Sequence, residues 1–196
     1  MIRFKSIIQL LIPILLVTGS ADAMSPKAAL KTLQKKYQTL HSLSVDFREV
    51  FEWGLTGESN IRLGKMMVTK DNRFRIDTVD QLIVSDGTDI YRYNRDRKQV
   101  IIEHIQDEDK FLPRKILLDF ADGFKAISLT ELAVAEKNGF RLDLEAEDPE
   151  VSLMSSAIIW ATTDDMVVHR LKLIDLNSNS TTYYPVSYTH LRAHET

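Results

Sequence analysis

The sequence contains no cysteine, so it forms no disulfide bond and carries no lipid on an N-terminal cysteine. Glycine is scarce, at seven residues in 196, and no glycine lies in a phosphate-binding loop motif or in the G-x-S-x-G turn of serine hydrolases. The net charge of −3 gives no indication of a nucleic-acid partner. A chain of this kind depends on the burial of apolar side chains for its stability.

Residues 1–23 have the pattern of a secretory signal peptide. Arg3 and Lys5 precede an apolar run over residues 7–17, and Ala21-Asp22-Ala23 provides small residues at the −3 and −1 positions of a cleavage site. The apolar run is shorter than the roughly 20 residues that span a bilayer. We therefore expect export of the chain and a mature start at Met24.

Hydrophobic periodicity predicts one helix followed by antiparallel strands. Ser25-Pro26 is a typical helix start, and apolar residues recur at helical spacing up to Leu40, so we expect a helix that ends near Ser42. Strands do not alternate with helices after it, which favours an antiparallel sheet. The expected strands are Ser44–Trp53, Ile61–Val68, Arg73–Asp77, Gln81–Ser85, Asp89–Asn94, Gln99–Ile105, Leu129–Ala135, Gly139–Glu145, Ser155–Thr162 and Val167–Asp175.

Two further segments interrupt this pattern. A short apolar helical segment is expected between Phe111 and Phe120, after six strands. Residues 185–196 show no alternation and follow a strand at Thr181–Tyr184 that should continue. We expect a single domain over residues 24–184, a non-native tail over 185–196, and a sheet whose final closure the tail disturbs.

No cluster of residues predicts catalysis. His190 and His194 have a spacing that binds metal on a helix, but no third ligand accompanies them. The carboxylates between Asp143 and Glu150 occupy alternate positions and a turn, as on a solvated face. We expect no catalytic residue, no metal and no cofactor, and hence no enzyme.

Three expected strands are apolar on both faces: Leu82–Val84, Val100–Ile102 and Ala157–Trp160. An antiparallel sheet with one wet face would alternate apolar and polar residues. The second apolar face either lines an interior cavity or packs in a sandwich core, and the residues alone leave both possibilities open.

Several blocks of residues resemble the outer-membrane lipoprotein carrier family, LolA. The strongest block has the order and spacing of that family's I-V-S-D-G segment, its two tyrosines and the Gln-Val that follows them. The matching residues are Tyr37, Leu43–Phe47, Gln81–Gly87, Tyr91–Asn94, Gln99-Val100 and, more weakly, Leu173–Asp175 with Asn179 and Thr181, where Ser178 replaces the family's usual glycine.

The resemblance implies a mainly β fold, an unclosed antiparallel β-barrel with an N-terminal helix and a short helical lid over an apolar cavity. It implies a periplasmic carrier that binds lipoprotein acyl chains and moves lipoproteins from the inner to the outer membrane. The implied partners are lipidated proteins, an inner-membrane lipoprotein-releasing transporter and an outer-membrane receptor, and we expect a monomer. The alternatives within the same fold are glycolipid transport and envelope-stress sensing.

The resemblance also implies a site. Each buried methylene is worth about 0.8 kcal/mol, so an acyl chain needs a large apolar shelter, which the lid fills when no cargo is bound. The family often has Arg-Pro where this chain has Lys70-Asp71, which leaves Lys70, Arg73 and Arg75 as candidates for the lid latch. Family position and strand parity assign the cavity to Met66, Val68, Phe74, Ile76, Leu82, Val84, Ile102 and Trp160, and the lid to Leu112, Pro113, Ile116 and Leu117.

Overall fold

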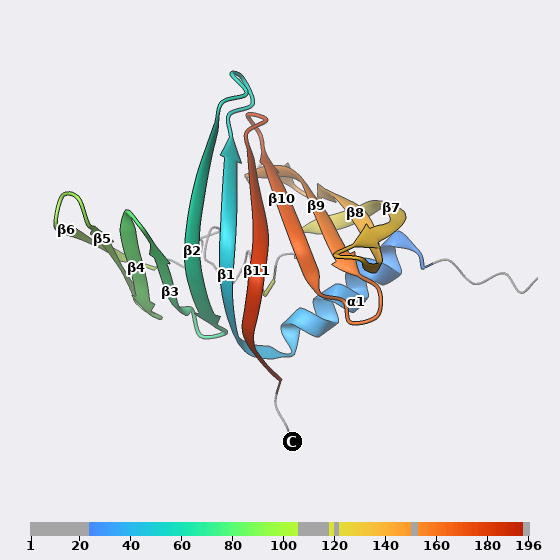
Figure 1. The fold of residues 1–196 in the computed structure, drawn as a ribbon, viewed down its shortest axis with the longest axis horizontal. Coiled ribbons are helices and arrows are strands. Elements are labelled where there is room, and N and C mark those ends of the chain that lie inside the picture. The colour runs from blue at the N-terminus through green and yellow to red at the C-terminus, as the bar shows by residue number, and fades with distance from the viewer. Residues whose placement is uncertain (1–23, 106–117, 120–121, 150–152, 194–196) are drawn as a thin grey trace, which may run out of the picture.

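The residues that the structure describes form one antiparallel sheet of eleven strands with a single helix against one of its faces (Figure 1). The structure is a computed structural model and describes residues 24–105, 118–119, 122–149 and 153–193. The strands follow the order β6-β5-β4-β3-β2-β1-β11-β10-β9-β8-β7, so the first and last strands of the order are edges and the barrel is unclosed. This confirms the predicted fold class of a mainly β, unclosed antiparallel barrel with an N-terminal helix.

The order of the elements along the chain also follows the predicted sequence of six strands and then a second set. The elements are α1 (Pro26–Gln38), β1 (Leu40–Glu52), β2 (Ser59–Thr69), β3 (Arg73–Thr78), β4 (Gln81–Asp86), β5 (Asp89–Asn94), β6 (Gln99–His104), β7 (Phe124–Val134), β8 (Lys137–Ala146), β9 (Met154–Thr162), β10 (Val168–Asp175) and β11 (Ser180–Ala193).

Helix α1 begins as its sequence predicts and ends earlier. The Ser25 hydroxyl accepts a hydrogen bond from the Ala28 amide at 3.2 Å, and Pro26 occupies the first turn, where its missing N–H costs nothing. The helix stops at Gln38, and not near Ser42, because the chain from Leu40 onward pairs as strand β1 with β2 and β11. Pairing across the sheet outweighs the helical spacing of Leu40.

Strands β1 and β11 join the two halves of the sheet. Their pairing extends from Glu52 with Ser180 to Leu40 with Ala193, so the expectation of a missing final closure is wrong. The ladder has register shifts between Asp46 and Phe47 and between Ser44 and Val45, which are β-bulges that add unpaired residues to β11. These bulges explain why the segment after Tyr184 shows no regular alternation. The non-native origin of residues 185–196 stays a prediction.

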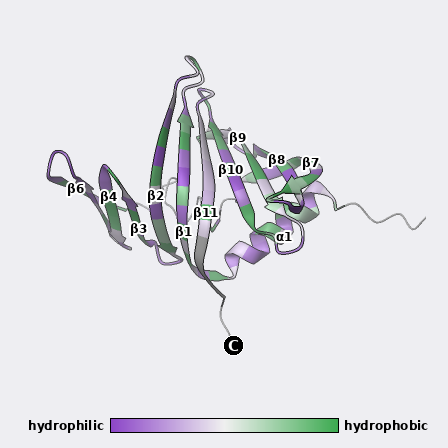
Figure 2. Ribbon diagram, viewed as in Figure 1, coloured by the Kyte–Doolittle hydropathy of each residue, from purple (hydrophilic) through white to green (hydrophobic). Residues whose placement is uncertain are grey.

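The face of the sheet that α1 covers, called the inner face below, contains the main core. Ala29 and Leu33 of α1 are fully buried, as are Phe140 and Leu142 of β8 and Ile159 of β9. Apolar and polar residues alternate along β8, so its side chains on the opposite face, called the outer face below, are mainly polar (Figure 2). In the described part of the chain, no helix has the length and apolar character needed to cross a membrane.

Candidate functional site

The inner face of β1 links all parts of the candidate site. Residues at alternate positions of a strand share a face, so Leu43, Val45, Phe47, Glu49 and Phe51 follow one another along it. They span about 27 Å at about 3.4 Å per residue. The first three side chains are buried, and the last two are partly buried. The Phe51 end of this row lies at a cavity on the inner face.

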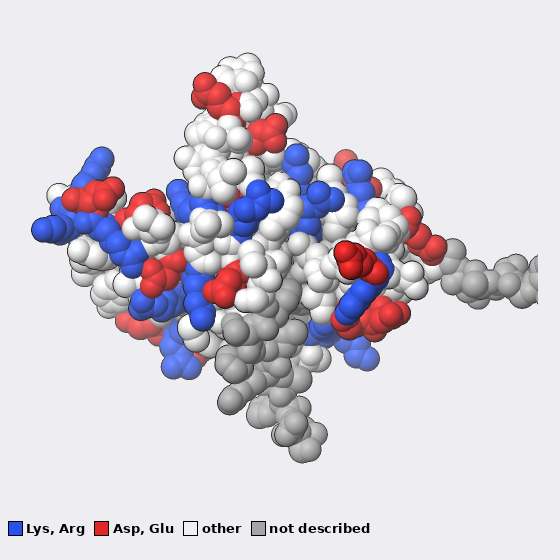
Figure 3. Space-filling model, viewed as in Figure 1, with Lys and Arg blue, Asp and Glu red and all other residues white. Residues whose placement is uncertain are grey.

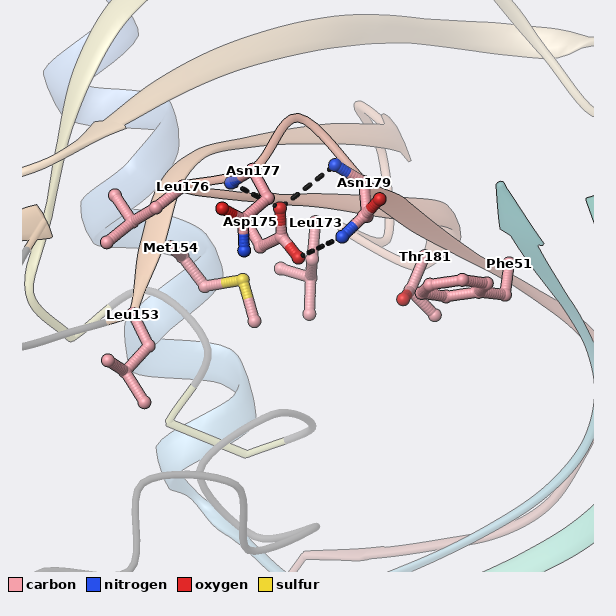
Figure 4. A pocket seen from close by; sticks show the side chains of 9 residues that line it. All are labelled: Phe51, Leu153, Met154, Leu173, Asp175, Leu176, Asn177, Asn179 and Thr181. Atoms are coloured by element: carbon pink, nitrogen blue, oxygen red, sulfur yellow. Dashed lines mark hydrogen bonds between the residues drawn. The ribbon is translucent and has the colours of Figure 1, made fainter. Parts of the chain in front are cut away.

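The first cavity lies at the Phe51 end and has a volume of about 410 Å³. Figure 4 shows Leu173 between Phe51 with Thr181 on one side and Met154 with Leu153 on the other. Its polar rim is the turn between β10 and β11, where the Asp175 carboxylate accepts bonds from the amides of Asn177 and Asn179. The remaining lining residue is Leu176. The arrangement is a mainly apolar pocket with a few fixed polar groups, as is common in ligand sites.

The second cavity lies at the Leu43 end, has a volume of about 540 Å³, and includes Val68 and Phe74, two of the predicted cavity residues. Most of its lining residues, among them the exposed Arg73 and Arg75, alternate with these buried side chains, so the cavity opens on the outer face of the sheet. Arg73 and Arg75 lie at its rim and bind Asp71 and Asp77 respectively, both at 2.7 Å. The other lining residues are Ser42, Leu43, Ser44, Met67, Thr69 and Ser85.

A small apolar cluster lies further along the inner face of β1, on the Leu43 side of the first cavity. It consists of Val45, Phe47 and Met66, with Ile76 packed against it. Register explains the grouping, because Val45 lies opposite Met66 and Met66 opposite Ile76. Four of the predicted cavity residues, Met66, Val68, Phe74 and Ile76, therefore share the inner face, and their role in lipid binding stays a prediction.

The parity assignment is wrong for the other four predicted cavity residues. Ile76 lies opposite Ile83, so Ile83 is on the inner face and its neighbours Leu82 and Val84 are on the outer face. Val84 lies opposite Tyr91, and Tyr91 lies opposite Ile102, so Ile102 is also on the outer face, where it is 64% exposed. In β3 the inner residues are even-numbered and in β4 they are odd-numbered, because the turn between these strands changes the parity. Because β4 carries apolar residues on both faces, its sequence pattern does not reveal this change of parity.

Trp160 also lies on the outer face. Its neighbour Ile159 is fully buried on the inner face, so Trp160 points the other way. The guanidinium carbon of Arg170 lies 3.4 Å from the centre of a Trp160 ring, and that of Arg141 lies 5.7 Å away. Trp160 is therefore held in a cation–π arrangement and does not line the inner face.

The predicted lid residues Leu112, Pro113, Ile116 and Leu117 lie outside the described residues. Leu118, which follows them, is 1% exposed and belongs to the inner-face core with Leu30 and Leu33 of α1. Of the latch candidates, Lys70 donates from its Nζ to the backbone carbonyl of Gln38 at the end of α1. Arg73 and Arg75 form the ion pairs with Asp71 and Asp77. The latch role of all three stays a prediction.

Sequence reasoning missed the lining of the first cavity. Phe51 and Leu173 stood within predicted strands, but their common face depends on pairings that cross most of the chain, Phe51 with Thr181 and Thr181 with Leu173. Leu153 and Met154 lie at the start of β9, where no alternation marks a face. The Asp-x-x-x-Asn pattern of Asp175 and Asn179 was the one available signal, since such residues form turns.

Polar groups also lie on the inner face of β1. The Glu49 carboxylate binds Arg62 with an Nη1–Oε1 distance of 3.2 Å, and the Tyr183 hydroxyl donates to the same carboxylate. Burial, together with this carboxylate, raises the pKa of Tyr183 above its ordinary value.

The described residues contain no group of three or more histidines or carboxylates arranged to hold a metal ion. On the side of the molecule seen in Figure 3, lysines and arginines are interspersed with carboxylates.

Comparisons with known proteins agree with this architecture. The Mycobacterium tuberculosis lipoprotein LppX superposes with a TM-score of 0.54 at 14% identity, over 86% of this chain and 98% of that chain. LprF from Mycobacterium bovis superposes with a TM-score of 0.52 at 10% identity, over 87% of this chain and 96% of that chain. At these identities the likeness concerns the fold alone.

The sequence has closer relatives. An outer-membrane lipoprotein carrier protein from Actinobacillus pleuropneumoniae serotype 3 (strain JL03) is 28% identical over 106 residues, which are 53% of this chain and 50% of the relative. A protein of the same description from serotype 7 (strain AP76) matches equally. The aligned part thus spans about half the length of these curated relatives. The family described as outer membrane lipoprotein carrier protein LolA matches residues 38–188, and the chain belongs to this family.

Proposed function

We propose that the protein is a periplasmic carrier that shelters the acyl chains of lipoproteins on the inner face of its unclosed sheet. It takes them from an inner-membrane transporter to an outer-membrane receptor, acts as a monomer and carries out no chemistry on its cargo. The observation that carries this proposal is the apolar path from Phe74 past Met66 and Phe47 to Phe51, where the path reaches the first cavity. Family membership supports the choice of lipoproteins as cargo.

The physical argument concerns the burial of hydrocarbon. Acyl chains cannot cross water exposed, since each methylene costs about 0.8 kcal/mol outside an apolar environment. The first cavity, of about 410 Å³, lies within the size range of small-molecule sites, about 300–1,000 Å³. Methionines such as Met66 and Met154 add side chains that adapt to ligands of different shape.

The test compares a substitution on the inner face with a matched one on the outer face. Ile76 and Val84 lie on neighbouring strands and are both partly buried, but they point to opposite faces. We expect wild-type protein purified from the periplasm to carry acylated lipoproteins, which mass spectrometry identifies. Ile76→Glu should lose most of this cargo, because a carboxylate on the apolar path is costly to bury, and Val84→Glu should keep it.

Circular dichroism of both variants shows whether each is folded before the cargo is compared. If the two folded variants carry equal amounts of lipoprotein, the inner face is not the binding face. Free glycolipid in place of lipoprotein would support the alternative of a glycolipid carrier, and no bound lipid in the wild-type protein would overturn the proposal.

A further inference from the structure

A group of three polar side chains interrupts the apolar path of the inner face. Glu49 lies opposite Tyr183 in the β1–β11 ladder and opposite Arg62 in the β1–β2 ladder. Directly opposite residues of antiparallel strands point to the same face, so all three side chains lie on the inner face. We call Glu49, Arg62 and Tyr183 the polar trio.

The polar trio lies between the apolar cluster and the first cavity. Phe47, two residues before Glu49, contacts the Tyr183 ring edge-on with the ring centres 6.3 Å apart. Phe51, two residues after Glu49, lines the first cavity together with Thr181. A ligand that occupies both the cavity and the apolar cluster must therefore pass over the polar trio.

The contacts within the polar trio leave it able to bind a ligand. Glu49 receives a hydrogen bond from Tyr183 and an ion pair from Arg62, and the side chains of Glu49 and Arg62 are 17% and 39% exposed. Within the described residues, the only further ionic neighbour of the guanidinium is Asp80, 3.9 Å from Nε. A guanidinium carries five N–H donors, and a neutral tyrosine hydroxyl that donates can still accept.

Stability alone gives little reason for such a group at this place. Replacing a buried ion pair by well-packed apolar side chains is often neutral or stabilising. The neighbouring positions on the same face of β1, Phe47 and Phe51, are apolar. Three polar side chains in register on three strands therefore indicate a function that needs both donors and acceptors.

The charges of the polar trio restrict the ligand. Arg62 carries one positive charge, and the carboxylates of Glu49 and Asp80 flank it with two negative ones. A phosphate or carboxylate would meet net negative charge and be repelled. An uncharged amide or ester fits better, because its carbonyl can accept from Arg62 and an amide N–H can donate to the Glu49 carboxylate.

We propose that Glu49, Arg62 and Tyr183 bind the uncharged amide or ester group at the root of the cargo's acyl chains. This inference rests on the proposed function, since it presupposes that acyl chains occupy the inner face. The polar trio fixes where the chains begin, so that one side of the path holds hydrocarbon in the first cavity and the other side holds it along Phe47 and Met66. It also selects neutral chain-to-head linkages over charged headgroups.

The test uses three ligands with the same sixteen-carbon chain: N-methylhexadecanamide, hexadecyl methyl ether and hexadecyl phosphate. Affinities are measured by displacement of a fluorescent fatty-acid analogue from the full-length protein. We expect wild-type protein to bind the amide about tenfold more tightly than the ether, as one hydrogen bond to a charged group allows. The phosphate should bind no better than the ether.

Two variants and one control locate the preference. Arg62→Gln and Tyr183→Phe should bring the affinities for the amide and the ether within about twofold of each other, mainly by weakening the binding of the amide. The control is Arg48→Gln, because Arg48 lies on the same sheet but on the outer face, 4.1 Å over the Tyr184 ring, and it should keep the tenfold preference. Tyr183→Phe retains the ring that packs against Phe47, so it serves if Arg62→Gln does not fold.

The outcomes separate the two proposals. If all three ligands bind with equal affinity, or if the variants keep the preference for the amide, the polar trio is not the linkage site but the carrier function stands. A preference for the phosphate likewise overturns the inference. If neither the amide nor the ether binds the wild-type protein, the proposed function itself fails and the inference fails with it.

Discussion

Gly64 is the position on the inner face where the smallest change should have a large effect. A Cβ atom there would lie 2.8 Å from the Phe47 ring and 2.8 Å from the Asp77 carbonyl oxygen, closer than real Cβ contacts. The absence of a side chain lets the Phe47 ring lie across β2 within the apolar cluster. We expect Gly64→Ala to lower the free energy of unfolding by about 1–3 kcal/mol, measured by urea denaturation.

Leu55→Ala is the control for this substitution, because Leu55 is 96% exposed in the turn between β1 and β2 and should change the stability by less than about 0.5 kcal/mol. An equal, small effect at both positions would show that the Phe47 ring moves aside without cost. The argument for a fixed apolar cluster at the centre of the inner face would then not hold.

Strand β11 beyond Tyr184 is the element whose removal tests the closure of the sheet. Its residues from Pro185 to Ala193 pair with β1 from Phe47 back to Leu40. Truncation after Tyr184 removes these backbone hydrogen bonds, each worth about 0.5–1.5 kcal/mol, and leaves one side of β1 unpaired. We expect faster hydrogen exchange of the amides in residues 40–47 and a lower melting temperature, measured by mass spectrometry and calorimetry.

A truncation after Ala193 serves as the comparison, since it keeps every pair of the β1–β11 ladder. If truncation after Tyr184 leaves hydrogen exchange in residues 40–47 unchanged, the pairing beyond Tyr184 contributes nothing to the fold. The segment would then behave as the non-native tail that its sequence suggested.

The elements show what the sequence could and could not predict. The strict alternation of Arg73-Phe74-Arg75-Ile76 placed the inner side chains of β3 on the face where the structure has them, because one face is charged and the other apolar. In β4, β6 and β9 both faces carry apolar residues, so the face of Val84, Ile102 and Trp160 depended on register across turns, which composition does not determine. The first cavity was missed for the same reason, since it combines residues of β1 with β9, β10 and β11.

At the scale of the whole molecule, burial is uneven across the sheet. Phe140, Leu142 and Ile159, on β8 and β9, are fully buried beneath α1, whereas all six residues of the edge strand β6 are exposed. Local opening costs least where few apolar contacts must break. The half of the sheet from β1 to β6 contains the apolar cluster with Phe74 and Ile76, so the proposed binding path lies largely in the part of the sheet away from this most deeply buried region.

This asymmetry predicts a graded response to cargo. We expect hydrogen exchange of the free protein to be fastest in β6, intermediate in β2 and β3, and slowest in β8 and β9. A ligand that binds only the folded state stabilises it in proportion to the logarithm of its concentration over its dissociation constant. An acyl ligand should therefore slow exchange in β2 and β3, where Met66, Val68, Phe74 and Ile76 contribute to the path, and change β6 little. Ile76→Glu should abolish this slowing, whereas equal protection of β6 and β3 by the ligand would show that it binds somewhere other than the inner face.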